Sequence, residues 1–384
     1  VLEIIISQYL FNRFEGLDEG RLTQMRASIV NTKSLANVFL QLDCKDMLQM
    51  SKGTNKLITT ADLQTHILML SPATENNERF VLVQRLLESK AIPVPGLPRA
   101  DMRRGYFLLE DLGDITFWQA LENTPKAVEV DSLYHGALSV LASLQVIRSA
   151  DHVLPRYDYT ELKRELDVCP DWFFSKVLRL DLDKQAVALF GAFSERLIDA
   201  AHAQPQVLVH RDYHSRNLMM SSGKLTPTVI DFQDAIIGPV CYDAASLLKD
   251  VYVVWPRGRQ LEWLAHYWRL LTETGQLPSD SWAQFIQWFD LIGLQRHVKI
   301  LGVFSRLWLR DDKPGYMRDI PVVIGYIREA CIEWGDDFPE LLLFWDWFEK
   351  EVMPTASRQN WYAGSGYYLR KKTVKPYQKN LLLN

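Results

Sequence analysis

The sequence lacks the features that would assign it to several large classes of protein. Its 384 residues include only four cysteines, and no two of them form a C-x-x-C pair. This spacing argues against a zinc site or a disulfide framework and fits a reducing compartment. No apolar run approaches the ~18 residues that a membrane-spanning helix needs. The apolar residues 4–6 follow Glu3 and precede no cleavage site, so we expect no signal peptide.

Excess charge is also lacking, because the net charge is only −4. We therefore expect neither nucleic acid nor a membrane as a partner. One segment departs from this balance: residues 354–384 contain no acid and six basic residues, which are Arg358, Arg370, Lys371, Lys372, Lys375 and Lys379. Together with Trp361 and Tyr362, these residues have the composition of an RNA-binding segment. We interpret the segment as a basic terminal extension.

The rest of the sequence has the pattern of a globular α+β chain, with 48% hydrophobic residues. Strands are predicted at residues 66–70 and 106–109, around a helix at 75–91 that prolines terminate. Helices then dominate, with Asp131 and Asp183 as predicted caps of the first two. Their predicted ranges are 131–147, 183–202, 242–254, 260–274, 279–309, 321–334 and 339–352. We expect a small sheet-and-helix lobe at 1–112, of which 1–65 is poorly matched, and a larger helical lobe at 113–353.

Two polar stretches interrupt the helical region, and each follows a short apolar run. The first reads HRDYHSRN from residue 210 to 217, and the second reads IDFQ from residue 230 to 233. The turn-forming residues 221–224 lie between them, which predicts a hairpin. We therefore expect Asp212, Asn217 and Asp231 to lie close together at the mouth of a small sheet.

These residues match the catalytic-loop pattern H-R-D-x-x-x-x-N, followed by a metal-binding Asp, of enzymes that transfer phosphoryl groups. In that pattern Asp212 is the catalytic base that orients the acceptor hydroxyl and takes its proton. Asn217 and Asp231 supply the oxygen ligands that suit Mg²⁺. Arg216 is predicted to stabilise charge on the transferring group, or else to pair with a nearby carboxylate.

Four stretches resemble the aminoglycoside phosphotransferase and choline kinase superfamily, and in particular the bacterial kinases that phosphorylate the anomeric hydroxyl of N-acetylmuramate and N-acetylglucosamine. They read FLLEDLGD (107–114), LVHRDYHSRNLM (208–219), VIDFQDAIIGPVCYDAASLLKD (229–250) and GLQRHVKILGVFSRLWLRDDKPGYMRDIP (293–321). The resemblance covers residues 66–353. It implies a two-lobed protein-kinase-like fold, with ATP and Mg²⁺ as cofactors and an amino sugar from cell-wall recycling as the acceptor. On this basis we expect a cytoplasmic monomer.

The resemblance also implies roles for residues outside the catalytic loop. The hinge between the lobes would bind the nucleotide through Leu109, Glu110 and Leu112. Gln233 and Asp234 would face the sugar. Arg296 and His297 lie on a long apolar helix, where a charged side chain needs a partner; that partner is either the lactate carboxylate of the substrate or an acid such as Asp290.

Three further residues are predicted to support the loop. His210 would orient it through hydrogen bonds, and Arg211 would form a structural ion pair. Asp243 would cap the helix that begins there.

The N-terminal region departs from the expected pattern. Kinase-like folds place a phosphate-binding Lys on a strand, yet residues 66–70 contain no basic residue other than His66. Lys45, Lys52 and Lys56 are the candidates for this role. Two alternatives follow: another small-molecule kinase of the superfamily, of the aminoglycoside or choline type, or a pseudokinase whose N-terminal lobe does not function.

Overall fold

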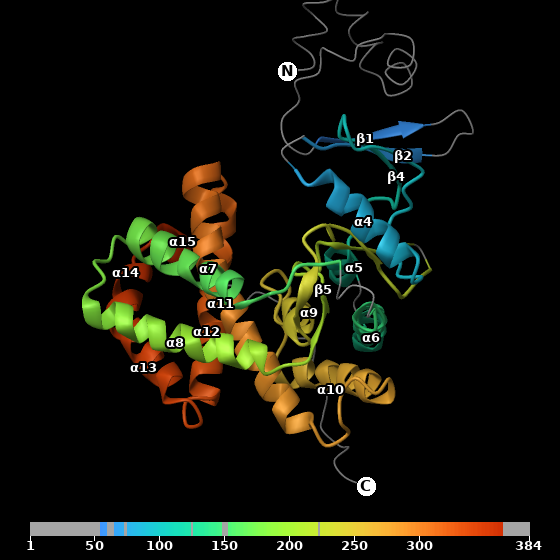
Figure 1. Ribbon diagram of the computed structural model, residues 1–384. Coiled ribbons are helices and arrows are strands. Elements are labelled where there is room, and N and C mark those ends of the chain that lie inside the picture. The colour runs from blue at the N-terminus through green and yellow to red at the C-terminus, as the bar shows by residue number, and fades with distance from the viewer. Residues whose placement is uncertain are drawn as a thin grey trace, which may run out of the picture. The chain divides into compact units, whose positions relative to one another are not determined.

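The computed structural model describes residues 54–59, 65–72, 75–123, 126–147, 153–221 and 223–363. The candidates Lys45 and Lys52 lie outside these residues, as does the basic segment after residue 363. The chain divides into two compact units (Figure 1). Unit 1 comprises Val1–Glu88 and Val94–Gly113, and unit 2 comprises Ser89–Pro93 and Asp114–Asn384.

Unit 1 is built on a four-stranded antiparallel sheet in the order β1-β2-β4-β3. Its strands are β1 (Thr54–Thr59), β2 (Thr65–Leu70), β3 (Arg99–Asp101) and β4 (Tyr106–Glu110). The two predicted strands, β2 and β4, are confirmed and pair with each other. The sequence analysis missed β1, which places the backbone of Lys56 opposite Leu68.

Helix α4 (Asn77–Glu88) covers this sheet. Its Phe80 ring lies edge-on to Phe107 of β4, with the ring centroids 5.2 Å apart. The Asn76 side chain accepts a hydrogen bond from the backbone N–H of Arg79 at 3.0 Å and so caps the helix. The predicted helix is confirmed, although it ends at Glu88, three residues before the predicted end and five before Pro93.

Unit 2 is mainly helical (Figure 1). Its α-helices are α5 (Phe117–Asn123), α6 (Ala127–Gln145), α7 (Tyr159–Val168), α8 (Lys184–His202), α9 (Tyr242–Leu248), α10 (Arg257–Glu273), α11 (Trp282–Asp311), α12 (Ile320–Glu333), α13 (Pro339–Trp347), α14 (Met353–Ala356) and α15 (Asn360–Ala363). π-helical segments at Cys169–Val177 and Phe348–Val352 continue α7 and α13, and a 3₁₀ helix at Pro314–Asp319 precedes α12. Helices α5, α7, α14 and α15 were not predicted from the sequence.

The long helix α11 is the centre of unit 2, and it packs against α7, α8, α9 and α12. Gly302 lets it approach α7 closely, because a Cβ at this position would lie 2.4 Å from the carbonyl group of Val168. A side chain there would force the two helices apart. Because α11 also carries Arg296, the packing of α11 against α7 affects the position of a residue in the candidate active site.

The two predicted helix caps have different outcomes. Asp183 accepts a hydrogen bond from the backbone N–H of Ala186 at 2.7 Å and caps α8, as predicted. Asp131 is not a cap, because α6 begins four residues earlier at Ala127. Instead, Asp131 pairs with Arg259 and accepts a hydrogen bond from the indole N–H of Trp263 at 2.8 Å. These contacts tie α6 to α10, which local sequence cannot reveal.

Cys169, Cys241 and Cys331 are buried and form no disulfide within the described part of the chain, and burial raises the pKa of each thiol. Within the part of the chain that the structure describes, no helix has the length and apolarity needed to cross a membrane.

Candidate active site

Two short antiparallel strand pairs hold the predicted catalytic loop. Strand β5 (Gln206–Val209) pairs with β8 (Ile236–Pro239), and the loop begins directly after β5. Strand β6 (Leu218–Met219) pairs with β7 (Thr228–Val229), so the loop ends where β6 begins. The predicted hairpin is therefore present, and it brings the segment after β7 back to the loop.

The three residues predicted to perform the chemistry lie together. The side-chain amide of Asn217 donates hydrogen bonds to the backbone carbonyl of Asp212 at 3.1 Å and to the Asp231 carboxylate at 3.2 Å. Asp231 has a φ of 65°, a left-handed conformation that is uncommon outside glycine. Gln233 donates a hydrogen bond to the other carboxylate oxygen of Asp231 at 2.8 Å. Gln233 thus contacts the metal-binding candidate, and its predicted contact with a sugar stays a prediction.

Asp243 anchors the start of the loop, and its predicted role as a helix cap is wrong. The residue at the cap of α9 is Cys241, which makes no side-chain capping bond. The fully buried Asp243 carboxylate accepts hydrogen bonds from the backbone N–H groups of His210 at 2.6 Å and Arg211 at 3.0 Å. Burial raises the pKa of Asp243 to about 7, although the two N–H donors act in the opposite direction.

His210 has the orienting role that we expected. Its Nε2 lies 3.0 Å from the carbonyl oxygen of Ile230, and its Nδ1 accepts a hydrogen bond from the backbone N–H of Asp212 at 3.3 Å. The ring therefore joins the two polar stretches. Burial lowers the pKa of His210, so the neutral ring is favoured.

The Asp212 carboxylate is accessible and strongly acidic. Its side chain is 45% exposed, and Nη1 of Arg296 lies 3.7 Å from its Oδ1. Burial by itself would raise the pKa of Asp212, but the positive charges of Arg296 and Lys299 outweigh it and lower the pKa to about 2. Asp212 is therefore ionised near neutral pH and can accept a hydrogen bond from an acceptor hydroxyl.

Arg296 reaches the catalytic loop rather than Asp290. Its Nη1 also donates a hydrogen bond to the backbone carbonyl of Arg211 at 3.0 Å, and its guanidinium lies over the Tyr242 ring. Asp290 has other partners, Lys249 at 2.7 Å and Arg257 at 2.5 Å. The proposed pairing of Arg296 with Asp290 is therefore wrong. The binding of Arg296 to a substrate carboxylate stays a prediction.

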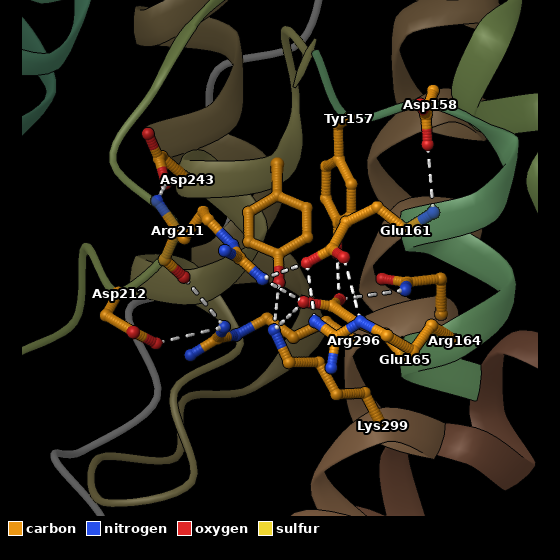
Figure 2. Close-up of polar contacts among 12 residues, drawn as sticks. Tyr157, Asp158, Glu161, Arg164, Glu165, Arg211, Asp212, Asp243, Arg296 and Lys299 are labelled. Carbon is orange, nitrogen blue, oxygen red and sulfur yellow. Dashed lines mark hydrogen bonds and ion pairs between the residues drawn. The ribbon is translucent and has the colours of Figure 1, made fainter. Parts of the chain in front are cut away.

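A buried charged cluster binds Arg211, the residue before Asp212 (Figure 2). Its centre is Glu165 on α7, whose side chain is 3% exposed. Glu165 forms ion pairs with Arg211 and with Lys299, the latter at 2.7 Å, and accepts a hydrogen bond from the Tyr157 hydroxyl. Glu161, one turn earlier, pairs with Arg211 at 3.0 Å. The structural ion pair predicted for Arg211 is therefore confirmed.

The remaining loop residues pack against rings. The Arg216 guanidinium lies 3.6 Å from the centre of the Tyr252 ring and 5.1 Å from that of Trp118. The structure thus gives Arg216 an aromatic environment, and its role toward a phosphoryl group stays a prediction. His214 contacts the edge of the Tyr252 ring, and its buried Nδ1 has no hydrogen-bond partner among the described residues.

The last predicted sugar-binding residues differ in accessibility. Asp234 is exposed. His297 is 1% exposed, stacks on Tyr326, and has its Nε2 3.1 Å from the carbonyl oxygen of Lys249. These contacts give His297 a packing role and leave its predicted contact with a substrate without support from the geometry.

The predicted hinge residues lie in unit 1. Leu109 and Glu110 belong to β4, and Leu112 follows it. The backbone N–H of Glu110 already donates a hydrogen bond to the Gly96 carbonyl at 2.9 Å. Asp111 accepts a hydrogen bond from the N–H of Gly113 at 2.9 Å and so closes a tight turn in which Gly113 has a φ of 77°. An adenine base would therefore have to use other backbone groups of this stretch.

The donor set at Asn217 and Asp231 fits a magnesium ion. No group of three or more His, Cys, Asp or Glu side chains suited to a metal occurs among the described residues. Mg²⁺ does not require such a group, because it usually takes one or two protein ligands together with water and substrate phosphates. Asp231 offers a carboxylate and Asn217 an amide oxygen, and the Asn217 amide nitrogen lies 3.2 Å from the Asp231 carboxylate, so the two side chains are neighbours.

The sequence analysis missed Glu165, Lys299 and the anchoring role of Asp243. One signal for Lys299 was available. It lies three residues after Arg296 in the same apolar helix, so the argument that Arg296 needs a partner applies to it equally. No comparable local signal marks Glu165, because its partners lie up to 134 residues away in the sequence.

Comparison with known proteins is consistent with this geometry. The phosphotransferase enzyme family matches residues 51–280. A Pseudomonas putida protein named N-acetylmuramate/N-acetylglucosamine kinase is 40% identical over 264 residues, which cover 69% of this chain and 76% of the relative. A Neisseria meningitidis protein of the same name is 34% identical over 72% of this chain and 81% of the relative.

Solved structures show the same fold at low identity. An ethanolamine kinase of Plasmodium vivax matches with a TM-score of 0.52 and 12% identity, over 83% of this chain and 95% of that structure. A choline kinase of Cryptosporidium parvum also matches with a TM-score of 0.52, at 13% identity over 76% of this chain and 89% of that structure. The predicted kinase-like fold is confirmed.

The N-terminal segment is similar to a different family. The ribonuclease III domain family matches residues 1–78. Ribonuclease 3 of Campylobacter fetus is 43% identical over 68 residues, which cover 16% of this chain and 30% of that protein. This second similarity was not predicted from the sequence, and it accounts for the poor match of residues 1–50 to kinases. The phosphotransferase match begins at residue 51, so the poorly matched region is shorter than the predicted 1–65. The two similarities overlap over residues 51–78, a range that contains β1 and β2.

Proposed function

Since this chain belongs to the phosphotransferase enzyme family, we propose that it transfers the γ-phosphoryl group of ATP to the anomeric hydroxyl of N-acetylmuramate or N-acetylglucosamine. The observation that carries the reaction is the gathering of Asp212, Asn217 and Asp231 at the ends of two strand pairs. The choice of sugar rests on the relatives that are 34–40% identical and carry both sugars in their names.

Asp212 is the base in this proposal. Its half-exposed carboxylate accepts a hydrogen bond from the sugar hydroxyl and orients the oxygen toward the γ-phosphorus atom. It takes the proton as the new P–O bond forms and the bond from the γ-phosphorus to ADP, the leaving group, breaks. With a pKa of about 2, Asp212 is a weak base. An anomeric hydroxyl suits such a base, because it is more acidic than an ordinary alcohol and gives up its proton more readily.

Asn217 and Asp231 would hold Mg²⁺, which neutralises charge on the phosphate oxygens when it is bound. The chain's own contribution is to keep these two side chains in register with Asp212, through the amide of Asn217. We assign Leu109, Glu110 and Leu112 to the nucleotide. For the phosphate-binding Lys, the described residues leave Lys56 of β1 as the candidate.

On the acceptor side, we assign Gln233, Asp234 and Arg296 to the sugar. Arg296 is the residue best suited to a lactate carboxylate, because its positive charge lies next to the base. We further propose that the enzyme acts as a cytoplasmic monomer in cell-wall recycling and binds neither nucleic acid nor a membrane.

The test is phosphoryl transfer from labelled ATP to a panel of acceptors that contains both amino sugars, choline and an aminoglycoside. We expect an acid-labile product, as an anomeric phosphate is, with either amino sugar, and a loss of transfer in Asp212→Asn. A product only with choline or the aminoglycoside would replace the sugar assignment. Equal background in wild type and variant would refute the catalytic assignment.

A second candidate function is that of a pseudokinase, and one observation favours it. Residues 1–78, where a phosphate-binding Lys is expected, are similar to the ribonuclease III domain family. A pseudokinase of this kind would show no thermal stabilisation by Mg-ATP. A stabilisation that disappears in Asp231→Asn would exclude it.

A further inference from the structure

Arg211, the residue before the proposed base, has an unusual backbone conformation. Its φ is 76°, in the left-handed region that glycine adopts readily and other residues rarely do. Such a conformation persists only where the surroundings hold it in place. Because Arg211 is bonded directly to Asp212, its backbone conformation helps to set the direction of the Asp212 side chain.

Neighbouring residues hold the backbone N–H, the carbonyl oxygen and Nη2 of Arg211. Asp243 accepts a hydrogen bond from its N–H at 3.0 Å, and Arg296 donates one to its carbonyl oxygen, also at 3.0 Å. Its guanidinium forms ion pairs with Glu165 and Glu161. These partners come from three helices: α9, α11 and α7 (Figure 2).

Of the two acids that bind the Arg211 guanidinium, Glu165 is the less replaceable. Glu161 is more exposed and shares its carboxylate with Arg164, whereas Glu165 is buried and binds Arg211 and Lys299 together. Lys299 also donates a hydrogen bond to the Tyr242 hydroxyl at 3.2 Å. Burial by itself would raise the pKa of Glu165, but the charges of Lys299 and Arg211 lower it to about 2, so the carboxylate keeps its charge.

We propose that Glu165 is a positioning residue for phosphoryl transfer, which holds the left-handed backbone of Arg211 and thereby aims the Asp212 carboxylate at the acceptor. The proposal rests on the proposed function for its catalytic readout. A second readout, amide hydrogen exchange in residues 208–219, does not depend on any substrate. The failure of one proposal can therefore be distinguished from the failure of the other.

The central variant is Glu165→Gln, which keeps the shape of the side chain and removes its charge. Asp290→Asn is the matched control. Asp290 is a similarly buried carboxylate that binds Lys249, Arg257 and the indole of Trp334, none of which belongs to the catalytic loop. We expect both variants to melt earlier than wild type. Only Glu165→Gln should lower kcat, by roughly 10- to 100-fold with little change in KM for ATP, and exchange its loop amides faster.

Arg211→Gly separates the side chain from the backbone conformation. Glycine adopts a φ of 76° without strain but cannot bind Glu165. We expect this variant to lose much of the kcat that Glu165→Gln loses, and the double variant to lose less than the two single losses combined, because both variants remove the contact between Arg211 and Glu165. Arg211→Lys should recover part of the rate.

The proposal is overturned if Glu165→Gln matches Asp290→Asn in both kcat and loop exchange. Wild-type turnover in Arg211→Gly would also overturn it, because the side-chain contact would then be dispensable. If wild type transfers no phosphoryl group to any acceptor, the proposed function fails. Loop exchange in the same two variants then still decides whether Glu165 holds the loop.

Discussion

Helix α11 carries a buried charged cluster on each of two faces. One cluster centres on Asp290 with Lys249 and Arg257, and the other joins Lys299 to Glu165 and Arg211. Asp290 and Lys299 are nine residues apart, which is about 14 Å along the helix and about half a turn around it. One rigid element therefore supports both clusters.

The clusters differ in what their partners do. The partners of Asp290 lie at or next to the ends of helices α9, α10 and α12, so their contacts fix helix against helix. The Glu165 cluster includes Arg211, which precedes the proposed base, and Lys299, whose charge lowers the pKa of Asp212. Burial and charge alone therefore do not distinguish a structural cluster from a functional one. The position of the partners does.

The largest expected effect comes from Asp212 itself. The losses of kcat in variants of the two clusters are compared with it. Asp212→Asn should reduce kcat by roughly 10²- to 10⁴-fold, the usual contribution of a general base. Its effect on unfolding should be small, because the side chain is half exposed. Urea denaturation together with steady-state kinetics measures both quantities. A variant that retains more than a tenth of the wild-type turnover would remove Asp212 from the role of base.

The next largest effect compares the two lysines. Lys249→Met should lower the free energy of unfolding by about 3 kcal/mol, because it leaves a buried carboxylate with one cation fewer. Lys299→Met should cost less stability, since Lys299 is 16% exposed against 2% for Lys249. Of the two variants, only Lys299→Met should also lower kcat. A larger loss of turnover in Lys249→Met would reverse the assignment of the two clusters.

A smaller effect compares two glycines of α11. Gly302→Ala should destabilise the protein by about 1–3 kcal/mol, because its methyl group meets the Val168 backbone. Gly293→Ala meets side chains rather than backbone, with the nearest atom of Lys249 at 3.2 Å and the Cβ of Ala245 at 3.7 Å. Its cost should be offset by the gain of about 1 kcal/mol from helix propensity. Equal losses in thermal denaturation would show that α11 is not seated against α7 at Gly302.

The smallest expected effect is a change in how stability depends on pH. It concerns His297, which contacts Lys249 of the Asp290 cluster. Burial, followed by the charge of Lys249, lowers the pKa of His297 to about 3. Between pH 6.5 and 3 the unfolded chain therefore binds a proton that the folded chain does not, and stability falls as the pH falls. His297→Gln should flatten this dependence by about 1–2 kcal/mol between pH 7 and 5.

Asp243 acts in the opposite direction and provides the contrast for this measurement. Its folded pKa, raised by burial to about 7, means that its contribution to stability is present in acid and is lost as the pH rises toward 7. Asp243→Asn should therefore steepen the acid loss of stability, whereas His297→Gln should reduce it. Urea denaturation at several pH values distinguishes the effects of the two substitutions on stability. Identical slopes in both variants would contradict the assignments.

The sequence predicted those parts of the molecule whose determinants are local. The strand-turn-strand pattern around residues 210–231 and the Asp183 cap depend on neighbouring residues, and both were predicted correctly. Asp131 and Asp243 had equally good local signals for caps, but both side chains form hydrogen bonds with residues distant in the sequence instead. Glu165 could not be found in this way, because it contacts Arg211 and Lys299 across 46 and 134 residues.

Unit 1 was harder to predict for a different reason. Strand β1 lies in the range that two families match, so its residues need not follow the pattern of sugar kinases. A short strand of mixed polarity, with Lys56 and two threonines among its residues, also gives a weak periodic signal.

The buried cysteines provide a chemical probe of the loop anchor. A thiol reacts with alkylating reagents as its thiolate, and burial keeps the thiol of Cys241 protonated and out of reach. Cys241 lies two residues before Asp243, so we expect it to become accessible to reagent when the segment that holds His210 and Arg211 opens. The rate of alkylation at Cys241, followed by mass spectrometry of its peptide, therefore reports how often the native protein releases its catalytic loop.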